Sequence, residues 1–257
     1  MAMNKSAGNM YQWVTHTWNP IAGECPHRCE YCYVGDLKSK PVLAEKYSGE
    51  PRLMESEMLT NLGSGNVIFV QNMGDLFAEG VPHSAIMAVL EHMREYDGNR
   101  YLLQTKNPIR MIEYAWELPP DVIVGTTVES DAPPESNAPH WVQRLAGLNA
   151  VRMAYRLHHL VENPHVKMEV MVSIEPVTRI HNMGKFLSSI VAIKPDFVSI
   201  GADSKKMGLD EPEQYQVYIL AHELQQFSKV ILKPNLKRIT GENLWNELLT
   251  DKNISKI

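Results

Sequence analysis

The sequence predicts an α/β protein, a partial or full (β/α) barrel with about six to seven parallel strands. The main observation is that short β-branched or aromatic runs alternate with longer amphipathic stretches along the 257-residue chain. This alternation is typical of parallel strands joined by right-handed helical crossovers. No linker or shift in composition divides the chain, so we expect one domain over residues 1–257, with residues 1–10 as a flexible leader.

Individual elements follow from length and periodicity. The segments that resemble strands are 12–18, 67–71, 101–105, 122–128, 167–174, 197–201 and 230–232. Apolar residues at helical spacing predict helices at 83–96, 108–116, 141–161, 184–193, 210–225 and 242–249. The segment 29–39 can also be helical, which would place Cys29 and Cys32 one turn apart on one face.

Composition limits the class of protein. The hydrophobic fraction of 44% and charged fraction of 21% are ordinary for a globular protein with a substantial core. A net charge of −5 argues against a protein that coats DNA, so any contact with nucleic acid must be local. No apolar run approaches the roughly 18 residues that a membrane-spanning helix needs. The first ten residues lack a signal-peptide core, and we expect a cytoplasmic protein.

The only three cysteines, Cys25, Cys29 and Cys32, lie within eight residues in the pattern C-x3-C-x2-C. In a reducing compartment, thiols grouped in this way indicate metal chemistry and not disulfides. Three thiolates are one ligand short of a four-coordinate site. A structural zinc site with His27 as fourth ligand is one explanation, although such sites usually combine two separated ligand pairs.

The cysteine pattern follows the first predicted strand, with an aromatic residue, Tyr31, just before the last cysteine. It resembles the signature of the radical S-adenosylmethionine (SAM) superfamily. The resemblance implies a 4Fe-4S cluster held by the three cysteines, whose fourth iron is chelated by SAM. It also implies a barrel-like fold with the cluster at the carboxyl ends of the strands, and a flavodoxin or ferredoxin-type reductant as partner.

Further stretches along nearly the whole chain are similar to those of a phage-associated radical SAM family. They are Trp18-Asn19-Pro20, Asn72-Met73-Gly74-Asp75-Leu76-Phe77, Leu103-Gln104-Thr105-Lys106-Asn107-Pro108, Gly125-Thr126-Thr127-Val128-Glu129 and Ser173-Ile174-Glu175-Pro176. Some relatives are implicated in thymidine hypermodification of bacteriophage DNA, where an N-linked glycyl-thymidine is isomerised to its C-linked form. The resemblance therefore implies an isomerase acting on DNA or a nucleotide in the host cytoplasm.

Polar residues that follow the predicted strands are the candidates for binding SAM, because ligands of parallel α/β sheets lie at the carboxyl ends of the strands. By analogy with the superfamily, the cofactor-binding set is Tyr31, Gly74, Asp75, Gln104, Thr127 and Glu129. Gly74 and Asp75 would receive the SAM ammonium group, although many superfamily members carry two glycines at this turn. Asp75 as a turn or helix cap is the structural alternative.

Two charged residues are the candidate catalytic groups. Lys106 could pair with the SAM carboxylate or a substrate phosphate, or it could be a solvated side chain at the rim. Glu175 could hold a substrate amine, or it could form an ion pair with Arg179 or Lys233. The late basic residues could dock phosphate or form a solvated face; they are Lys205, Lys206, Lys229, Lys233, Lys237 and Arg238.

The cysteine count also limits the mechanism. With no fourth cysteine, a thiyl hydrogen donor and a second cysteine-bound cluster are both disfavoured. A tyrosine donor, an external reductant or return of hydrogen from 5′-deoxyadenosine remain, and the last belongs to isomerases. Two alternatives to the isomerase are a radical SAM lyase that repairs DNA photoproducts and a zinc-stabilised nucleic-acid adaptor without catalysis.

Overall fold

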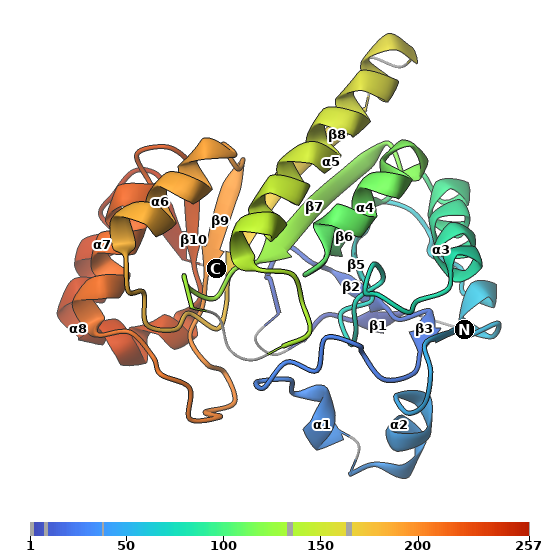
Figure 1. Cartoon of the computed structure of the whole chain (residues 1–257), viewed down its shortest axis with the longest axis horizontal. Coiled ribbons are helices and arrows are strands. Elements are labelled where there is room, and N and C mark those ends of the chain that lie inside the picture. The colour runs from blue at the N-terminus through green and yellow to red at the C-terminus, as the bar shows by residue number, and fades with distance from the viewer. Residues whose placement is uncertain (1–2, 8–9, 38, 133–135, 163–165, 257) are drawn as a thin grey trace.

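A computed structural model describes residues 3–7, 10–37, 39–132, 136–162 and 166–256. It contains a nine-stranded sheet in the order β1-β2-β5-β6-β7-β8-β9-β10-β11 (Figure 1). The strands are β1 (Asn4–Lys5), β2 (His16–Trp18), β5 (Val67–Val70), β6 (Arg100–Gln104), β7 (Asp121–Thr127), β8 (Lys167–Ile174), β9 (Phe197–Ile200), β10 (Lys229–Leu232) and β11 (Ile254–Lys256).

From β2 to β11 neighbouring strands pair in parallel, and β1 pairs with β2 antiparallel. The strand order is linear, because β1 and β11 do not pair with each other within the described ranges. The fold is therefore a partial barrel, which confirms the predicted α/β class. We propose that the described parts of the chain form one domain.

The helices are α1 (Val34–Leu37), α2 (Pro41–Lys46), α3 (His83–Glu95), α4 (Pro108–Met111), α5 (Trp141–Glu162), α6 (Met183–Ala192), α7 (Gln214–Leu224) and α8 (Lys237–Leu248). Figure 1 shows α3 to α8 along the outer face of the sheet, whereas α1 and α2 lie apart from it. Short 3₁₀ turns lie at η1 (Glu57–Leu59), η2 (Ile112–Glu117) and η3 (Pro234–Leu236), and β3 (Ile21–Ala22) pairs with β4 (Arg52–Leu53) in a separate small sheet. None of the helices in the described part of the chain is long and apolar enough to cross a membrane.

The helices form where apolar side chains recur at helical spacing. In α3, Ile86, Val89, Leu90 and Met93 are all buried in the core between sheet and helices. This stripe agrees with the predicted helix at 83–96, whose end differs by one residue because helix ends fray.

A second, smaller core lies on the inner face of the sheet. Tyr11 and Val14 of the N-terminal segment are buried there, and Trp13 packs edge-on against Phe197 with ring centroids 5.7 Å apart. The predicted strand 12–18 is therefore wrong in its first half, since β2 begins at His16. Aromatic side chains carry a large apolar area, and here it is buried against the inner face of the sheet.

The predicted flexible leader at residues 1–10 needs a partial correction. Asn4 and Lys5 pair with Thr17 and His16, so this part of the leader is an edge strand. Residues 1–2 and 8–9 of the leader lie outside the described residues.

Three predicted helix starts are also wrong. The helix expected at 242–249 is the second part of α8, which begins at Lys237 and is kinked at Gly241, where φ is 69°. The other two differ for a reason that the contacts show. The helix expected at 29–39 begins at Val34, and a turn precedes it in which the Cys32 N–H donates to the Cys29 carbonyl at 3.0 Å. Helix α7 begins at Gln214 and not at residue 210, because the Asp210 carboxylate instead accepts from Arg179 at 2.9 Å. In both places tertiary contacts override weak local preferences.

Candidate functional site

A cavity of about 610 Å³ opens where the parallel strands end. All three cysteines line it, together with residues that follow β5, β6, β7, β8, β9 and β10. Every predicted site residue except Glu129 contributes to its wall: Cys25, Cys29, Cys32, Tyr31, Gly74, Asp75, Gln104, Lys106, Thr127 and Glu175. Ligands of parallel α/β sheets lie at this edge, so this cavity is the candidate site.

The three cysteines are half-buried, and none forms a disulfide. Burial and the nearby Asp75 carboxylate raise the pKa of Cys25 to about 12. Burial also raises the pKa of Cys29, although Lys106 opposes this effect. Within the described residues, no three His, Cys, Asp or Glu side chains are grouped to hold a single metal ion.

Three thiols that face one cavity fit the donor set of a cluster, since each cluster thiolate binds a different iron. His27, the predicted fourth ligand of a zinc site, does not join the thiols in such a group. Its Nε2 atom lies 2.7 Å from Asp75 Oδ2, and the imidazole is 3% exposed.

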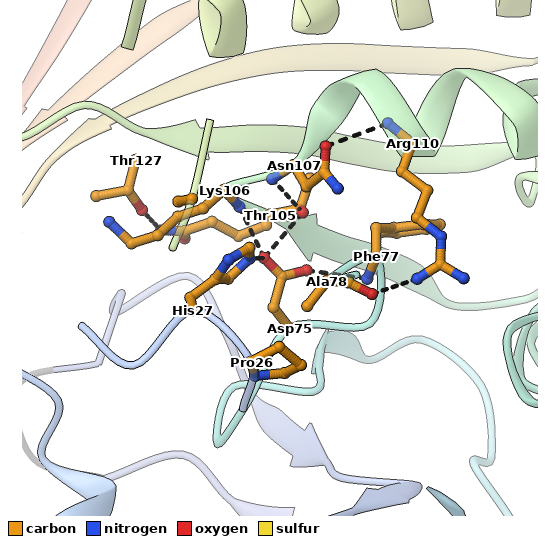
Figure 2. Close-up of polar contacts among 12 residues, drawn as sticks. Pro26, His27, Asp75, Phe77, Ala78, Thr105, Lys106, Asn107, Arg110 and Thr127 are labelled. Atoms are coloured by element: carbon orange, nitrogen blue, oxygen red, sulfur yellow. Dashed lines mark hydrogen bonds and ion pairs between the residues drawn. The ribbon is translucent and has the colours of Figure 1, made fainter. Parts of the chain in front are cut away.

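Asp75 lies at the centre of a hydrogen-bond network (Figure 2). Its Oδ2 atom accepts from the Thr105 hydroxyl at 2.9 Å and from the Lys106 N–H at 2.8 Å. Its Oδ1 atom accepts from the Phe77 N–H at 2.9 Å. Burial alone would raise the pKa of Asp75, but His27 and these donors outweigh it and lower the pKa below its usual value.

Glu129 lies behind the cavity wall and is 1% exposed. It forms ion pairs with Lys106 and with Arg144, whose Nη1 atom is 2.9 Å from Glu129 Oε2, and it accepts from the Tyr31 hydroxyl. These cations outweigh the effect of burial and lower the pKa of Glu129. The carboxylate is thus an internal counter-ion, and Lys106 is a buried cation beside the cysteines, not a solvated rim residue.

The polar floor of the cavity comes from side chains on the inner face of the sheet. Gln104 donates to Thr127 Oγ1 at 2.8 Å and accepts from the Tyr11 hydroxyl at 3.0 Å. The Tyr11 hydroxyl is also 3.0 Å from Ser173 Oγ. Burial and the Glu175 charge raise the pKa of Tyr11, so this phenol stays neutral.

Sequence reasoning missed Tyr11 and Ser173 as parts of the site. Ser173 could have been found from strand alternation, because Met171 and Ser173 share the inner face of β8. No local signal marks Tyr11, since it lies between the expected leader at 1–10 and the expected strand at 12–18.

Glu175 pairs with Lys233 across the cavity wall, with 2.6 Å between Oε2 and Nζ. This confirms one of the two ion pairs considered for Glu175, while Arg179 pairs with Asp210 instead. Gly201 makes room for the acid, because a Cβ atom there would lie 2.7 Å from the Glu175 carboxyl carbon.

The late basic residues do not form one phosphate-binding face. Lys233 is 4% exposed and Lys205 lines the cavity, whereas Lys237 pairs with Glu242 and Arg238 with Glu211.

Asn19 of the Trp18-Asn19-Pro20 motif holds the turn after β5 through hydrogen bonds. The Asn19 carboxamide accepts from the Met73 N–H at 2.9 Å and donates to Asn72 Oδ1 at 2.9 Å. The Tyr33 hydroxyl, from the cysteine loop, donates to the Asn72 carbonyl at 3.0 Å. Gly74 follows, and a Cβ atom there would lie 2.8 Å from Gln71 Nε2, so the Gln71 side chain would have to shift.

Residues 9–184 match the profile of the family described as "protein of unknown function (DUF5131)". The chain belongs to this family. A comparison of the whole sequence with curated proteins finds no match.

Among solved structures, a cysteine-to-serine mutant of spore photoproduct lyase is similar with a TM-score of 0.51 and 12% identity, covering 76% of this chain and 57% of that chain. Spore photoproduct lyase complexed with dinucleoside spore photoproduct has a TM-score of 0.49 and 12% identity, and the match covers 76% of this chain and 57% of that chain. A mutant of that enzyme with bound AdoMet and dinucleoside spore photoproduct has a TM-score of 0.48 and 11% identity, and the match covers 96% of this chain and 66% of that chain. The chain thus spans less than two thirds of the length of these proteins, and the first likeness shows a shared partial-barrel fold.

Proposed function

We propose that this protein is a radical SAM enzyme with a 4Fe-4S cluster held by Cys25, Cys29 and Cys32. The observation that carries the proposal is that all three thiols line one cavity with the Glu175–Lys233 pair at the carboxyl ends of the strands. When bound, the reduced cluster with SAM supplies a 5′-deoxyadenosyl radical that removes hydrogen from a substrate. A flavodoxin or ferredoxin would supply the electron.

The chain's own residues have distinct parts in this proposal. The turn at Gly74 lets the backbone approach SAM closely, and Gln104 and Thr127 offer polar atoms for its ribose or carboxylate. Lys106 places a positive charge beside Cys29, which favours the thiolate form that binds iron. The aromatic residues of the N-terminal segment close the inner face beneath the cavity and keep water from it.

For the substrate we propose a modified thymidine in phage DNA hypermodification, whose N-linked glycyl group is isomerised to the C-linked form. A glycyl group carries an amine and a carboxylate, and the cavity offers both Glu175 and Lys233. The chain has no fourth cysteine to donate hydrogen, which supports return of hydrogen from 5′-deoxyadenosine. The motifs shared with the phage-associated family support the same assignment.

The radical SAM assignment is tested on protein purified without oxygen. We expect a brown protein with about four iron atoms per chain that converts SAM to 5′-deoxyadenosine when reduced. Cys29→Ala removes one thiolate and should abolish both colour and SAM cleavage, whereas Gly184→Ala on the outer helix α6 should retain both. A colourless anaerobic preparation with stoichiometric zinc would contradict the proposal.

The substrate assignment is tested by mass spectrometry of nucleosides from phage DNA that carries the N-linked glycyl-thymidine. Incubation with enzyme, SAM and reductant should give a product of equal mass and different retention. Loss of thymine photoproducts from irradiated DNA would instead indicate a lyase. Salt-dependent DNA binding without SAM cleavage would indicate the zinc-stabilised adaptor.

A further inference from the structure

His27 connects the cysteine loop to the rest of the cavity wall. It lies between Cys25 and Cys29 in sequence, two residues from each of these cysteines. Its imidazole turns inward and contacts Asp75 Oδ2 at 2.7 Å (Figure 2). A residue of the cysteine loop therefore contacts the turn after β5 through its side chain.

Asp75 is itself fixed by two further segments. The Phe77 N–H belongs to its own turn, while the Thr105 hydroxyl and the Lys106 N–H belong to the end of β6. With His27, four donors among the described residues contact this carboxylate, and a carboxylate has about four lone-pair sites. Three of these donors contact Oδ2 and only the Phe77 N–H contacts Oδ1, so the Oδ2 atom is committed to joining His27 to the end of β6.

The backbone of the cysteine loop is also held by hydrogen bonds from Asn137. The Asn137 N–H donates to the His27 carbonyl at 2.8 Å, and the Asn137 carboxamide donates to the Pro26 carbonyl at 3.0 Å. The loop around His27 is thus held from two sides by contacts within the protein. Ordering a residue costs backbone entropy, so a loop that is already ordered binds a cluster more tightly.

We propose that Asp75 is a positioning residue that acts through His27 to hold the cysteine loop in its cluster-binding conformation. The inference rests on the proposed function, because it concerns the affinity of the same cluster. It also explains why Asp75 and Thr105 occupy adjacent parallel strand ends, since both are needed at one point.

The test compares Asp75→Ala, His27→Ala and His27→Gln with the wild type, each reconstituted with iron and sulfide under anaerobic conditions. Asp131→Asn is the matched control, because Asp131 also accepts backbone N–H groups and lies 3.3 Å from a histidine, His181, but does not line the cavity. Three quantities are measured: iron retained against a chelator, the SAM affinity of the cluster-loaded fraction, and the melting temperature of the cluster-free chain.

Loss of outer partners of metal ligands typically costs about 10- to 100-fold in metal affinity. We expect a loss in this range for Asp75→Ala and His27→Ala, with wild-type SAM affinity in the fraction that stays loaded. His27→Gln should recover part of the loss, since a glutamine amide can still donate to Asp75. Because His27→Ala tests the same contact, the inference stays testable if Asp75→Ala fails to fold.

Two results would overturn the inference. One is normal iron retention with weakened SAM binding in Asp75→Ala, which would make Asp75 a SAM ligand. The other is iron retention in the His27 variants equal to that of Asp131→Asn. Failure of the wild type to take up a cluster is a separate outcome, and it would overturn the proposed function together with this inference.

Discussion

The Nζ atom of Lys233 lies 2.6 Å from Glu175 Oε2, and both side chains face the cavity that the three cysteines line. Lys233 also lies over the Tyr11 ring, 4.3 Å from its centroid. A buried cation thus connects the last strands of the sheet to the N-terminal segment.

The first prediction concerns this pair. Lys233→Met removes the cation beside a mostly buried carboxylate, and losing one partner of a buried pair costs about 3 kcal/mol. We expect the free energy of unfolding to fall by about that amount in urea titrations at pH 7. The double variant Lys233→Met/Glu175→Gln should regain most of it, and costs that simply add would contradict the assigned pairing.

Gly201 should control the position of Glu175. Gly201→Ala places a Cβ atom 2.7 Å from the Glu175 carboxyl carbon, so the acid must move. Overpacking of this kind costs about 1–3 kcal/mol, and turnover of the substrate should fall while SAM binding is unchanged. Gly184→Ala is the control, since its nearest neighbour would be 3.8 Å away. Equal turnover in the two variants would refute the role of Gly201.

Loss of the Glu129 carboxylate should destabilise the protein more than loss of one of its two cation partners. Glu129→Gln leaves the Lys106 and Arg144 cations together in the interior, whereas Lys106→Met leaves the Glu129–Arg144 pair intact. We expect Glu129→Gln to cost about 3–5 kcal/mol and Lys106→Met clearly less. At about 2–4 °C per kcal/mol, thermal denaturation resolves the difference. The reverse order would show that Glu129 is not the counter-ion of both cations.

Asp131 makes one pH-dependent contribution to the stability. Burial alone would raise the pKa of Asp131, but the His181 and Asn182 N–H groups outweigh it and lower the pKa below the usual value. The folded-state pKa is then below the unfolded value of about 3.9, so the contribution is complete above pH 4 and lost as the pH falls through the folded pKa.

We therefore expect Asp131→Asn to cost about 1 kcal/mol at pH 7. The difference from the wild type should shrink as unfolding is measured at successively lower pH below 4. A difference that stays constant down to acid pH would show that the Asp131 charge does not stabilise the folded state.

Local sequence patterns were sufficient to place helices and strands where the apolar periodicity was strong. The stripe of Ile86, Val89, Leu90 and Met93 predicted α3 within one residue, and β-branched runs located the central strands. Because parallel strands end at one edge, the same reasoning brought Gln104, Thr127 and Glu175 to one cavity. Weak signals of only a few residues gave wrong helix starts: the turn at Cys29 is not helical, and α7 begins at Gln214 and not at residue 210.

The sequence by itself determined the fold class, the grouping of three thiols on one loop, and the lack of a fourth cysteine, because periodicity and spacing are properties of the chain alone. Only the tertiary structure decided the partner of each charge. The sequence pattern does not distinguish between the polar residues at the strand ends, such as Lys106, Asp75 and Glu129. In the structure, Glu129 is an internal counter-ion and Asp75 is linked to His27. The physical reason is that burial and pairing depend on residues distant in sequence, such as Arg144 for Glu129 and Lys233 for Glu175.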